Sequence, residues 1–211
     1  MRLNVLRMRF KLRGTSIHIG FPFAVLLFAA FTYAAGGTML LLVLSSLFHE
    51  AGHLACMFFC GVAVNEVRFG LFGINIIRSD KRLCAMRGDV LISLGGPAAS
   101  VLLCLIGLAV YTLTQNTAFA RIALINAVLA GFNLLPVYSL DGGTALYAHI
   151  CMHSTVNSAE KCITVLSFIT VIPVIITGMY IFLYTRGNFT VLFCGCYLLL
   201  MMILKKQYNR L

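Results

Sequence analysis

Charged residues are scarce in this sequence. They account for 10% of its 211 residues, and only six of them are acidic. A soluble globular domain carries about 25% charged and about 45–50% apolar residues, whereas the apolar fraction here is 61% and the mean hydropathy is +0.97. This composition excludes a disordered chain, a fibrous repeat and an ordinary soluble enzyme. It predicts an integral membrane protein.

The sequence also contains no Cys-x-x-C pair, although it has eight cysteines. A structural zinc site made of four thiolates is therefore not supported. Cys56 and Cys60 are four residues apart in one predicted helix, so a pairing between them is compatible with the spacing but not required by it. We interpret most of the cysteines as small apolar packing residues.

Apolar runs predict an all-α polytopic membrane protein with about six transmembrane helices, because a helix needs about 20 apolar residues to cross a bilayer. The predicted spans cover residues 17–35, 38–60, 90–113, 119–137, 162–184 and 189–204. The first run resembles a secretory signal peptide, but it has no clear small-residue cleavage site, and we interpret it as a retained span. Neither a repeat nor a low-complexity linker divides the chain, so we expect a single domain over residues 1–211.

The segment between the second and third spans has a different pattern. Residues 62–77 are rich in β-branched and aromatic side chains, and Gly70 and Gly73 interrupt them. This pattern predicts a short membrane-associated β-hairpin. The exposed edge of such a hairpin can hold an extended peptide substrate by β-addition. A hairpin that only rests on the membrane interface explains the pattern equally well.

The net charge of +10 comes from basic residues that lie in the loops between apolar runs. Membrane orientation explains this distribution better than nucleic-acid binding does, so we expect no nucleic-acid partner. With the N-terminus in the cytoplasm, fourteen Lys and Arg residues are cytoplasmic, and only Arg121 and Arg186 lie on the other side. The positive-inside bias therefore predicts a multi-pass protein with both termini in the cytoplasm.

Two of the six acidic residues lie within or against apolar runs. These are Glu50 and Asp141; the others lie in loops or at the ends of spans, namely Glu66, Asp80, Asp89 and Glu160. An ionisable group inside a span costs several kcal/mol on some scales and is a functional candidate by default. Glu50 and Asp141 are therefore the acidic residues most directly linked to function.

Glu50 belongs to an H-E-x-x-H motif, His49-Glu50-Ala51-Gly52-His53. Residues four apart in a helix lie on one face, so the two imidazoles can chelate one Zn²⁺. Glu50 is then placed to act as acid and base without being a ligand. The alternative is a polar helix–helix contact without metal, but three polar residues inside an apolar run favour the zinc site.

A catalytic zinc site uses three protein ligands, so a third must come from another part of the chain. Asp141 is the candidate. It follows Asn133 and Pro136, where Pro136 should end a helix, and it precedes Gly142 and Gly143, which permit an irregular turn. The alternative is an Asp-Gly-Gly loop at the membrane rim. We predict that Asn133 and Pro136 bind substrate, although the Asn133 amide could equally satisfy carbonyls near Pro136.

A second histidine pair, His149 and His153, has the same spacing but no glutamate inside it. The surrounding segment is amphipathic, and we interpret it as a surface helix. Adventitious metal binding is the alternative. These two histidines are the only donors that compete with Asp141 for the third ligand position.

Three segments of the chain, in this order, resemble the site-2 proteases, a family of intramembrane zinc metalloproteases. The segments are His49 to His53, Gly96-Pro97, and Asn133…Pro136…Leu140-Asp141-Gly142. The resemblance implies that His49, His53 and Asp141 bind one zinc ion per chain and that Glu50 is the catalytic acid/base.

The predicted spans, the cytoplasmic N-terminus and the missing PDZ insertion resemble the sporulation branch of that family, which processes a pro-sigma factor. Ser139 and Ser100 depart from the residues that many members have, and the chain has no room for a CBS domain. The resemblance implies regulated intramembrane proteolysis of a membrane-associated transcription-factor or sigma-factor precursor in the bacterial plasma membrane. A membrane regulator or inhibitor protein is a further expected partner.

Two other functions compete with proteolysis. The first is a non-proteolytic zinc-binding membrane chaperone or regulator, which could lose Glu50 without penalty, so the intact Glu50 argues against it. The second is a metal transporter, which would need several ligand pairs along a path across the membrane. The sequence shows one such cluster, and an intramembrane zinc metalloprotease is therefore the predicted function.

Overall fold

The computed structural model describes the backbone of residues 7–12, 15–20, 37–62, 64–70, 73–78, 86–185 and 187–208. Side chains are described for residues 37–62, 87–185 and 187–203. The chain divides into two compact units. The first unit comprises Met1–Cys84 with Gly95–Ala130, and the second comprises Ala85–Leu94 with Gly131–Leu211.

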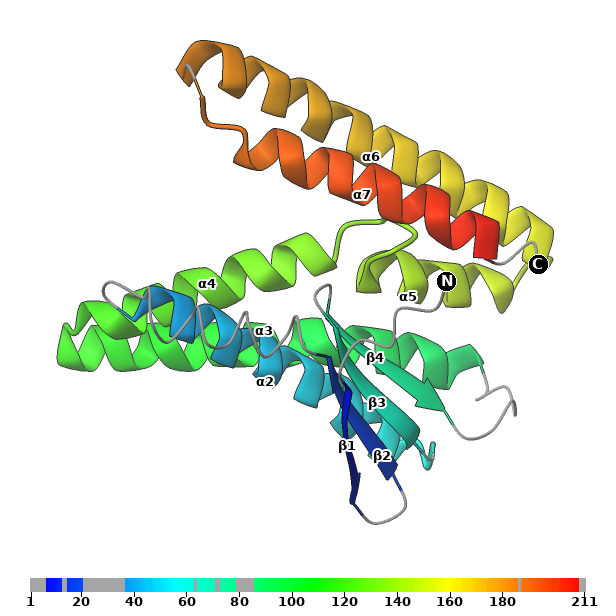
Figure 1. Ribbon diagram of the computed structural model, residues 1–211, viewed down its shortest axis with the longest axis horizontal. Helices are drawn as coiled ribbons and strands as arrows, with labels where there is room; N and C mark the ends of the chain where they lie inside the picture. Colours follow the sequence, from blue (N-terminus) through cyan, green and yellow to red (C-terminus); the bar gives the residue numbers. More distant parts are fainter. Residues whose placement is uncertain are drawn as a thin grey trace. The chain divides into compact units, whose positions relative to one another are not determined.

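The described residues form six helices and a four-stranded sheet (Figure 1). The helices are α2 Thr38–Phe59, α3 Met86–Thr114, α4 Thr117–Asn133, α5 Asp141–Cys151, α6 Val156–Thr185 and α7 Thr190–Tyr208. The strands are β1 Arg7–Leu12, β2 Thr15–Gly20, β3 Val64–Gly70 and β4 Gly73–Arg78.

Three helices in the described part of the chain are long and apolar enough to cross a membrane, namely α2, α6 and the Arg87–Thr114 part of α3. The apolar helices α4 and Thr190–Ile203 of α7 are shorter. The predicted count of six spans is therefore not supported. Three candidate spans nonetheless fit a membrane protein.

The start of the first predicted span is wrong. Residues 15–20 form β2, because β-branched residues at positions 15, 17 and 19 alternate with Ser16 and His18, a period of two that suits a strand. Residues 21–35 of that prediction lie outside the described residues. The fourth predicted span also ends early, since α4 stops at Asn133, three residues before Pro136.

The sheet has the strand order β1-β2-β3-β4 (Figure 1). The outer pairs are antiparallel, and β2 pairs with β3 in parallel, with Ser16 opposite Glu66 and His18 opposite Arg68. The predicted hairpin segment, residues 62–77, contains most of β3 and β4, which form an antiparallel pair with an irregularity between Val64 and Glu66. This pair is half of a larger sheet, and its association with the membrane stays a prediction.

In the first unit, α2 and α3 approach each other closely through small residues. A Cβ atom on Gly52 would lie 2.6 Å from Ala99 Cβ, and one on Gly95 would lie 2.7 Å from Cys56 Sγ. Small residues at a helix contact allow the backbones to come together without the hydrophobic driving force that water supplies. This contact brings the H-E-x-x-H helix directly against α3.

In the second unit, α6 packs against both α5 and α7, and Figure 1 shows α6 and α7 side by side. The core of this unit is formed by Val137, Val171 and Leu198. Val137 lies in the segment between α4 and α5, so this non-helical segment is folded into the core and does not loop out from it. Its backbone must therefore find hydrogen-bond partners inside the protein.

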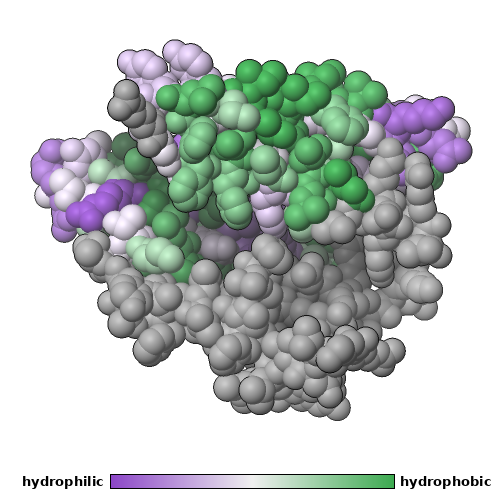
Figure 2. Space-filling model, turned by 45° about the horizontal axis from the view of Figure 1, so that its top comes forward, coloured by the Kyte–Doolittle hydropathy of each residue, from purple (hydrophilic) through white to green (hydrophobic). Residues whose placement is uncertain are grey.

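Large apolar side chains are exposed on every long helix. Examples are Leu42, Leu105, Leu124, Ile169, Ile176 and Leu200. Figure 2 shows hydrophobic residues in green over much of the described surface seen in that view. Water disfavours large exposed apolar patches on a monomer, whereas lipid chains do not. The described surface therefore fits a protein whose helices face a bilayer.

Candidate metal centre

One face of α2 is buried, and it carries both histidines of the H-E-x-x-H motif. The buried residues Ser45, His49, His53 and Met57 follow one another at intervals of four, so they form a single stripe along the helix. His49 is 4% exposed and His53 is 9% exposed. The helical period therefore accounts for the burial of both imidazoles in an otherwise apolar segment.

The two imidazoles present their Nε2 atoms to the same place. Their ring centroids are 5.1 Å apart, and their candidate ligand atoms lie within 4.8 Å of each other. A Cβ atom on Gly96 of α3 would lie 2.6 Å from His49 Nε2 and would also collide with His53 Nε2. Both Nε2 atoms therefore converge on the space that Gly96 leaves empty, as a chelating pair requires.

The other ring nitrogen of His49 has a partner on α3. The distance between His49 Nδ1 and Ser100 Oγ is 2.9 Å, and Ser100 is completely buried. Sequence reasoning noted Ser100 only as a departure from a family pattern and did not link it to His49. The available signal was a polar residue four positions after Gly96 in a strongly apolar run, since such residues are costly unless they are paired.

A second polar contact joins α2 to α4. Asn126 Nδ2 donates hydrogen bonds to Ser45 Oγ and to the Ile122 carbonyl, each at 2.9 Å. Both Asn126 and Ser45 are buried, and Asn126 Oδ1 has no hydrogen-bond partner among the described residues. This contact, which the sequence prediction missed, fixes α4 against the turn of α2 that precedes His49.

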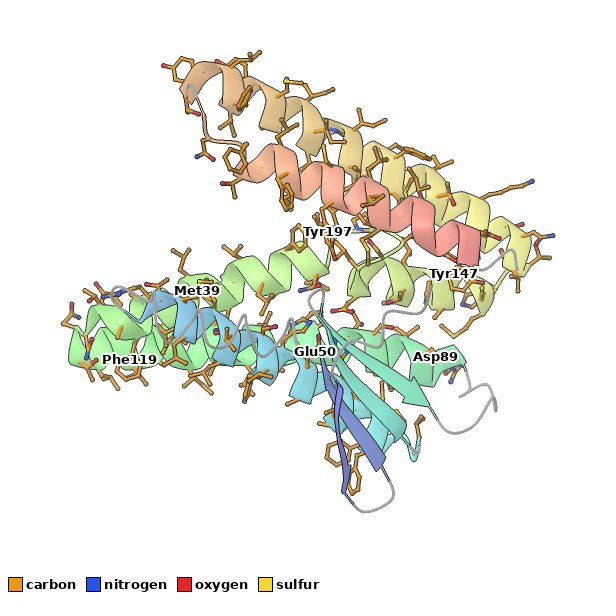
Figure 3. All side chains as sticks on the ribbon, viewed as in Figure 1. Met39, Glu50, Asp89, Phe119, Tyr147 and Tyr197 are labelled. Atoms are coloured by element: carbon orange, nitrogen blue, oxygen red, sulfur yellow. The ribbon has the colours of Figure 1, made fainter. Side chains whose placement is uncertain are left out.

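Glu50 also lies on α2, where Figure 3 labels it, and its side chain is half-buried. It follows His49 directly, so it is offset from the buried stripe by about 100° around the helix. The predicted role of Glu50 as acid and base is compatible with this position and stays a prediction.

Asp141 belongs to the second unit and is the first residue of α5. The chain approaches it through tight turns, in which Val137 N donates to the Leu135 carbonyl and Leu140 N to the Val137 carbonyl. Gly142 and Gly143 are required here, because a Cβ atom on either would collide with carbonyl oxygens of this preceding segment. The predicted helix break near Pro136 agrees with this geometry. The irregular turn predicted at Gly142 and Gly143 does not, because both glycines lie in the first turn of α5, where they allow the preceding segment to approach closely.

The segment before Asp141 is attached to α6 by Ser167. The Tyr138 amide donates to Ser167 Oγ at 2.8 Å, and Ser167 Oγ donates to the Ile163 carbonyl at 2.7 Å. Ser167 is completely buried within the long apolar helix. Non-helical backbone at membrane depth is tolerated where protein groups satisfy it, and Ser167 does so for Tyr138.

The predicted substrate-binding residues lie on either side of the end of α4. Asn133 is the last residue of the helix, and Pro136 lies in the non-helical segment that follows. Both are half-buried. Ser139 Oγ, in the same segment, is buried and has no hydrogen-bond partner among the described residues. Substrate binding by Asn133 and Pro136 stays a prediction.

The second histidine pair lies at the C-terminal end of α5. His149 and His153 are both exposed, and their ring centroids are 5.5 Å apart. The exposure of the histidines agrees with a surface helix.

Tyr147 lies on the same helix, between Asp141 and the two histidines. Burial and the neighbouring Cys151 thiol raise the pKa of Tyr147 to about 12, so its phenol is neutral at physiological pH.

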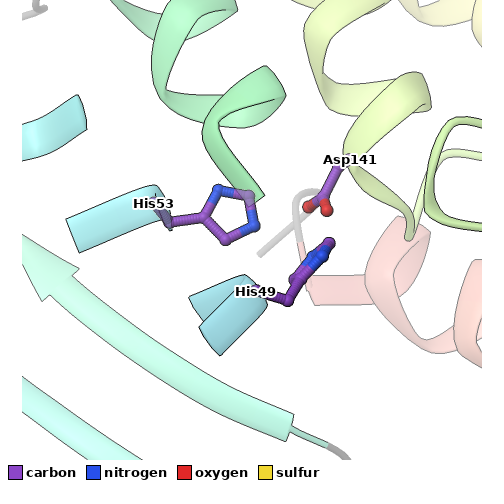
Figure 4. Close-up of side chains that lie close together, drawn as sticks. All are labelled: His49, His53 and Asp141. Atoms are coloured by element: carbon purple, nitrogen blue, oxygen red, sulfur yellow. The ribbon is translucent and has the colours of Figure 1, made fainter. Parts of the chain in front are cut away.

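The donor set of His49, His53 and Asp141 could bind a metal ion (Figure 4). Each residue offers one ligand atom, which gives two imidazole nitrogens and one carboxylate oxygen. Two histidines and a carboxylate make up one of the protein ligand sets found in catalytic zinc sites, which keep a further position open. The chemistry of the three side chains therefore fits zinc.

Comparison with known proteins gives a structural likeness and no match by sequence. No protein-family model matches the chain, and no curated protein does. Among solved structures, the chain is similar to a site-2 protease from Methanocaldococcus jannaschii, with a TM-score of 0.61 and 19% identity over 93% of this chain and 94% of that one. At this identity the likeness shows a shared fold.

Proposed function

We propose that this chain is an intramembrane zinc metalloprotease, a metalloendopeptidase of the site-2 protease type. The observation that carries the proposal is the convergence of His49 Nε2 and His53 Nε2 on one buried space in a helix that is apolar enough to cross a membrane. The fold shared with a site-2 protease supports it. In the proposal, Asp141 supplies the third ligand.

Zinc bound by these residues would activate a water molecule and polarise the carbonyl of the bond to be cut. Glu50 takes the proton from the attacking water and passes it to the leaving amine. The burial of His49 and His53 excludes bulk water around them, which strengthens charge interactions at the site. Asn133 and Pro136 hold the substrate backbone near the end of α4.

The proposed substrate is a membrane-associated protein, and the exposed apolar side chains of the helices support this proposal. We extend the proposal to regulated intramembrane proteolysis of a transcription-factor or sigma-factor precursor, as in sporulation, on the sequence resemblance alone. In this proposal the chain is a multi-pass protein of the bacterial plasma membrane with both termini in the cytoplasm, and a membrane protein regulates it.

The test begins with metal content. Protein purified in mild detergent should carry one zinc ion per chain, and the variant that combines His49→Ala with His53→Ala should carry none. Zinc-free wild-type protein that cannot be reloaded would overturn the proposal.

Proteolysis is tested by co-expression with a panel of tagged, single-span transcription-factor precursors. Wild-type protein should cleave at least one of them, and the His49→Ala, His53→Ala variant should cleave none. Stoichiometric zinc without cleavage of any precursor would instead favour the zinc-binding chaperone or regulator.

A further inference from the structure

We propose that Ser100 is a positioning residue of the metal centre, which holds the His49 ring so that Nε2 is presented to the metal. The inference rests on the proposed zinc site. It starts from the 2.9 Å contact between Ser100 Oγ and His49 Nδ1, which joins the middle of α3 to the buried stripe of α2.

The contact determines which nitrogen of His49 can bind a metal. A neutral imidazole carries a proton on one ring nitrogen and a lone pair on the other. When Nδ1 donates its hydrogen to Ser100 Oγ, the lone pair is on Nε2. His49 Nε2 is also the atom that faces the space beside Gly96, so the hydrogen bond and the direction of the ring select the same nitrogen.

Gly96 and Ser100 act together because they are four residues apart on α3 and share one face of the helix. Gly96 leaves space in front of Nε2, and Ser100 occupies the position next to Nδ1. The contact of Gly52 with Gly95 and Ala99 fixes this face of α3 against α2. A single neighbouring helix therefore holds the His49 ring at Nδ1 and leaves space in front of its Nε2.

Packing alone does not account for a serine at this position. Ser100 is completely buried, and a hydroxyl in an apolar helix is costly unless it is hydrogen-bonded. An alanine would fill nearly the same volume without that cost. Histidine ligands commonly donate their second N–H to a neighbouring group, and loss of that group typically weakens metal binding by about 10–100-fold.

The experiment measures zinc affinity by competition with a chelator of known affinity, on purified full-length protein in detergent. Ser100→Ala should weaken zinc binding by about 10–100-fold, and Ser100→Thr, which keeps the hydroxyl, should recover most of the loss. Ser45→Ala is the matched control, because Ser45 is also a buried serine and accepts a hydrogen bond from Asn126, with no histidine bonded to it among the described residues. That control should keep wild-type affinity.

Cobalt substitution gives a second readout that a purely structural role would not move. The visible absorption of bound Co²⁺ reports the geometry of its ligands, and it should change in Ser100→Ala and stay unchanged in Ser45→Ala. If Ser100→Ala does not fold, Ser100→Cys replaces it, because a thiol of similar size is a weaker hydrogen-bond acceptor. Ser100→Cys should then show an intermediate loss of affinity.

Equal zinc affinity in Ser100→Ala and Ser45→Ala, or in Ser100→Cys and wild type where that variant is used, would overturn the inference. These measurements do not need a substrate, so they separate the inference from the proposed proteolysis. Wild-type protein that binds zinc without cleaving any peptide would remove the protease and leave the role of Ser100 intact. Wild-type protein that binds no zinc would overturn the proposed function and this inference together.

Discussion

Gly96 on α3 lies so close to His49 on α2 that a Cβ atom at position 96 would be 2.6 Å from His49 Nε2. Ordinary side-chain contacts are longer than that, so one methyl group here would fill the space in which the two imidazoles converge. The absence of a side chain on Gly96 is therefore part of the candidate metal centre, and its substitution is a direct test of that centre.

Gly96→Ala should weaken zinc binding by at least about 10-fold, at the lower limit of what a disturbed ligand environment causes. Its own helix should not suffer, because alanine is a better helix former than glycine by about 1 kcal/mol. Gly131→Ala is the matched control, since a Cβ atom on Gly131 in α4 meets nothing within 4 Å. Chelator competition measures both. Unchanged affinity in Gly96→Ala would contradict the convergence of the two imidazoles as the binding geometry.

Glu50→Gln should keep one zinc ion per chain and lose cleavage by about 10²–10⁴-fold, because the amide cannot take the proton from the attacking water. Metal analysis and a cleavage assay on the same preparation check this. His49→Ala, which should lose zinc and cleavage together, is the comparison. Normal turnover by Glu50→Gln would sink the proposed mechanism.

Asp141→Ala and Asp141→Asn should both lower zinc affinity and stop proteolysis, since a neutral amide is a poor zinc ligand compared with a carboxylate. The variant that combines His149→Ala with His153→Ala is the control, because this exposed pair is the competing donor. Loss of zinc in the control, with zinc kept in Asp141→Ala, would place the third ligand elsewhere.

The other four acidic residues provide a comparison set for Asp141. Alanine substitutions of Glu66, Asp80, Asp89 and Glu160 should each keep most of the activity. Glu66 lies in β3, outside the predicted spans, and the sequence predicts the other three in loops or at the ends of spans, where we expect water to solvate them. The cleavage assay used for Asp141 measures all four. A loss at any of them comparable to that of Asp141→Ala would mean that burial against a span is a poor guide to the site.

Ser167→Ala should lower the free energy of unfolding by about 1–3 kcal/mol, because it leaves the Tyr138 amide without its acceptor. The substitution should also weaken zinc binding if Asp141 is a ligand, since Tyr138 precedes Asp141 by three residues. Thr170→Val on the same helix is the control, because the Thr170 hydroxyl donates to the Leu166 carbonyl of α6 itself. Unfolding in SDS, followed by circular dichroism, measures the difference, and equal stability of the two variants would contradict the anchoring role.

Both termini should be cytoplasmic, on the basis of the fourteen-to-two distribution of basic residues. Reporter fusions at residues 1 and 211, active on only one side of the membrane, test each end separately. A reporter at either end that works outside the cytoplasm would overturn the predicted orientation.

The local parts of the site were predictable from the sequence. The burial of His49 and His53 on one face follows from the helical period, and the helix break before Pro136 follows from proline chemistry. The contact of Ser100 with His49 was not predictable, because it depends on how α3 is rotated and shifted against α2. That register is set by the close contacts of Gly52 with Gly95 and of Gly95 with Cys56, which join residues far apart in the sequence and which no local pattern reports.

The N-terminal strands also depend on contacts that the local sequence does not predict. Hydropathy placed residues 17–20 at the start of a span, because Ile17 and Ile19 are apolar and an apolar run follows. These residues instead form a strand, because β2 lies between β1 and β3 and its backbone groups pair with both neighbours. Whether an apolar segment becomes a strand or a helix depended here on residues 66–69, which lie far along the chain.

The parallel pairing of β2 with β3 also constrains how the protein is made. During synthesis, β1 and β2 leave the ribosome first, but β2 cannot acquire its parallel neighbour until the whole of α2 and then residues 66–69 have been translated. Until then one edge of β2 has unpaired backbone groups, which attract other strands. The sheet therefore completes late, and a nascent chain paused within α2 should be more prone to aggregation than one released after β4.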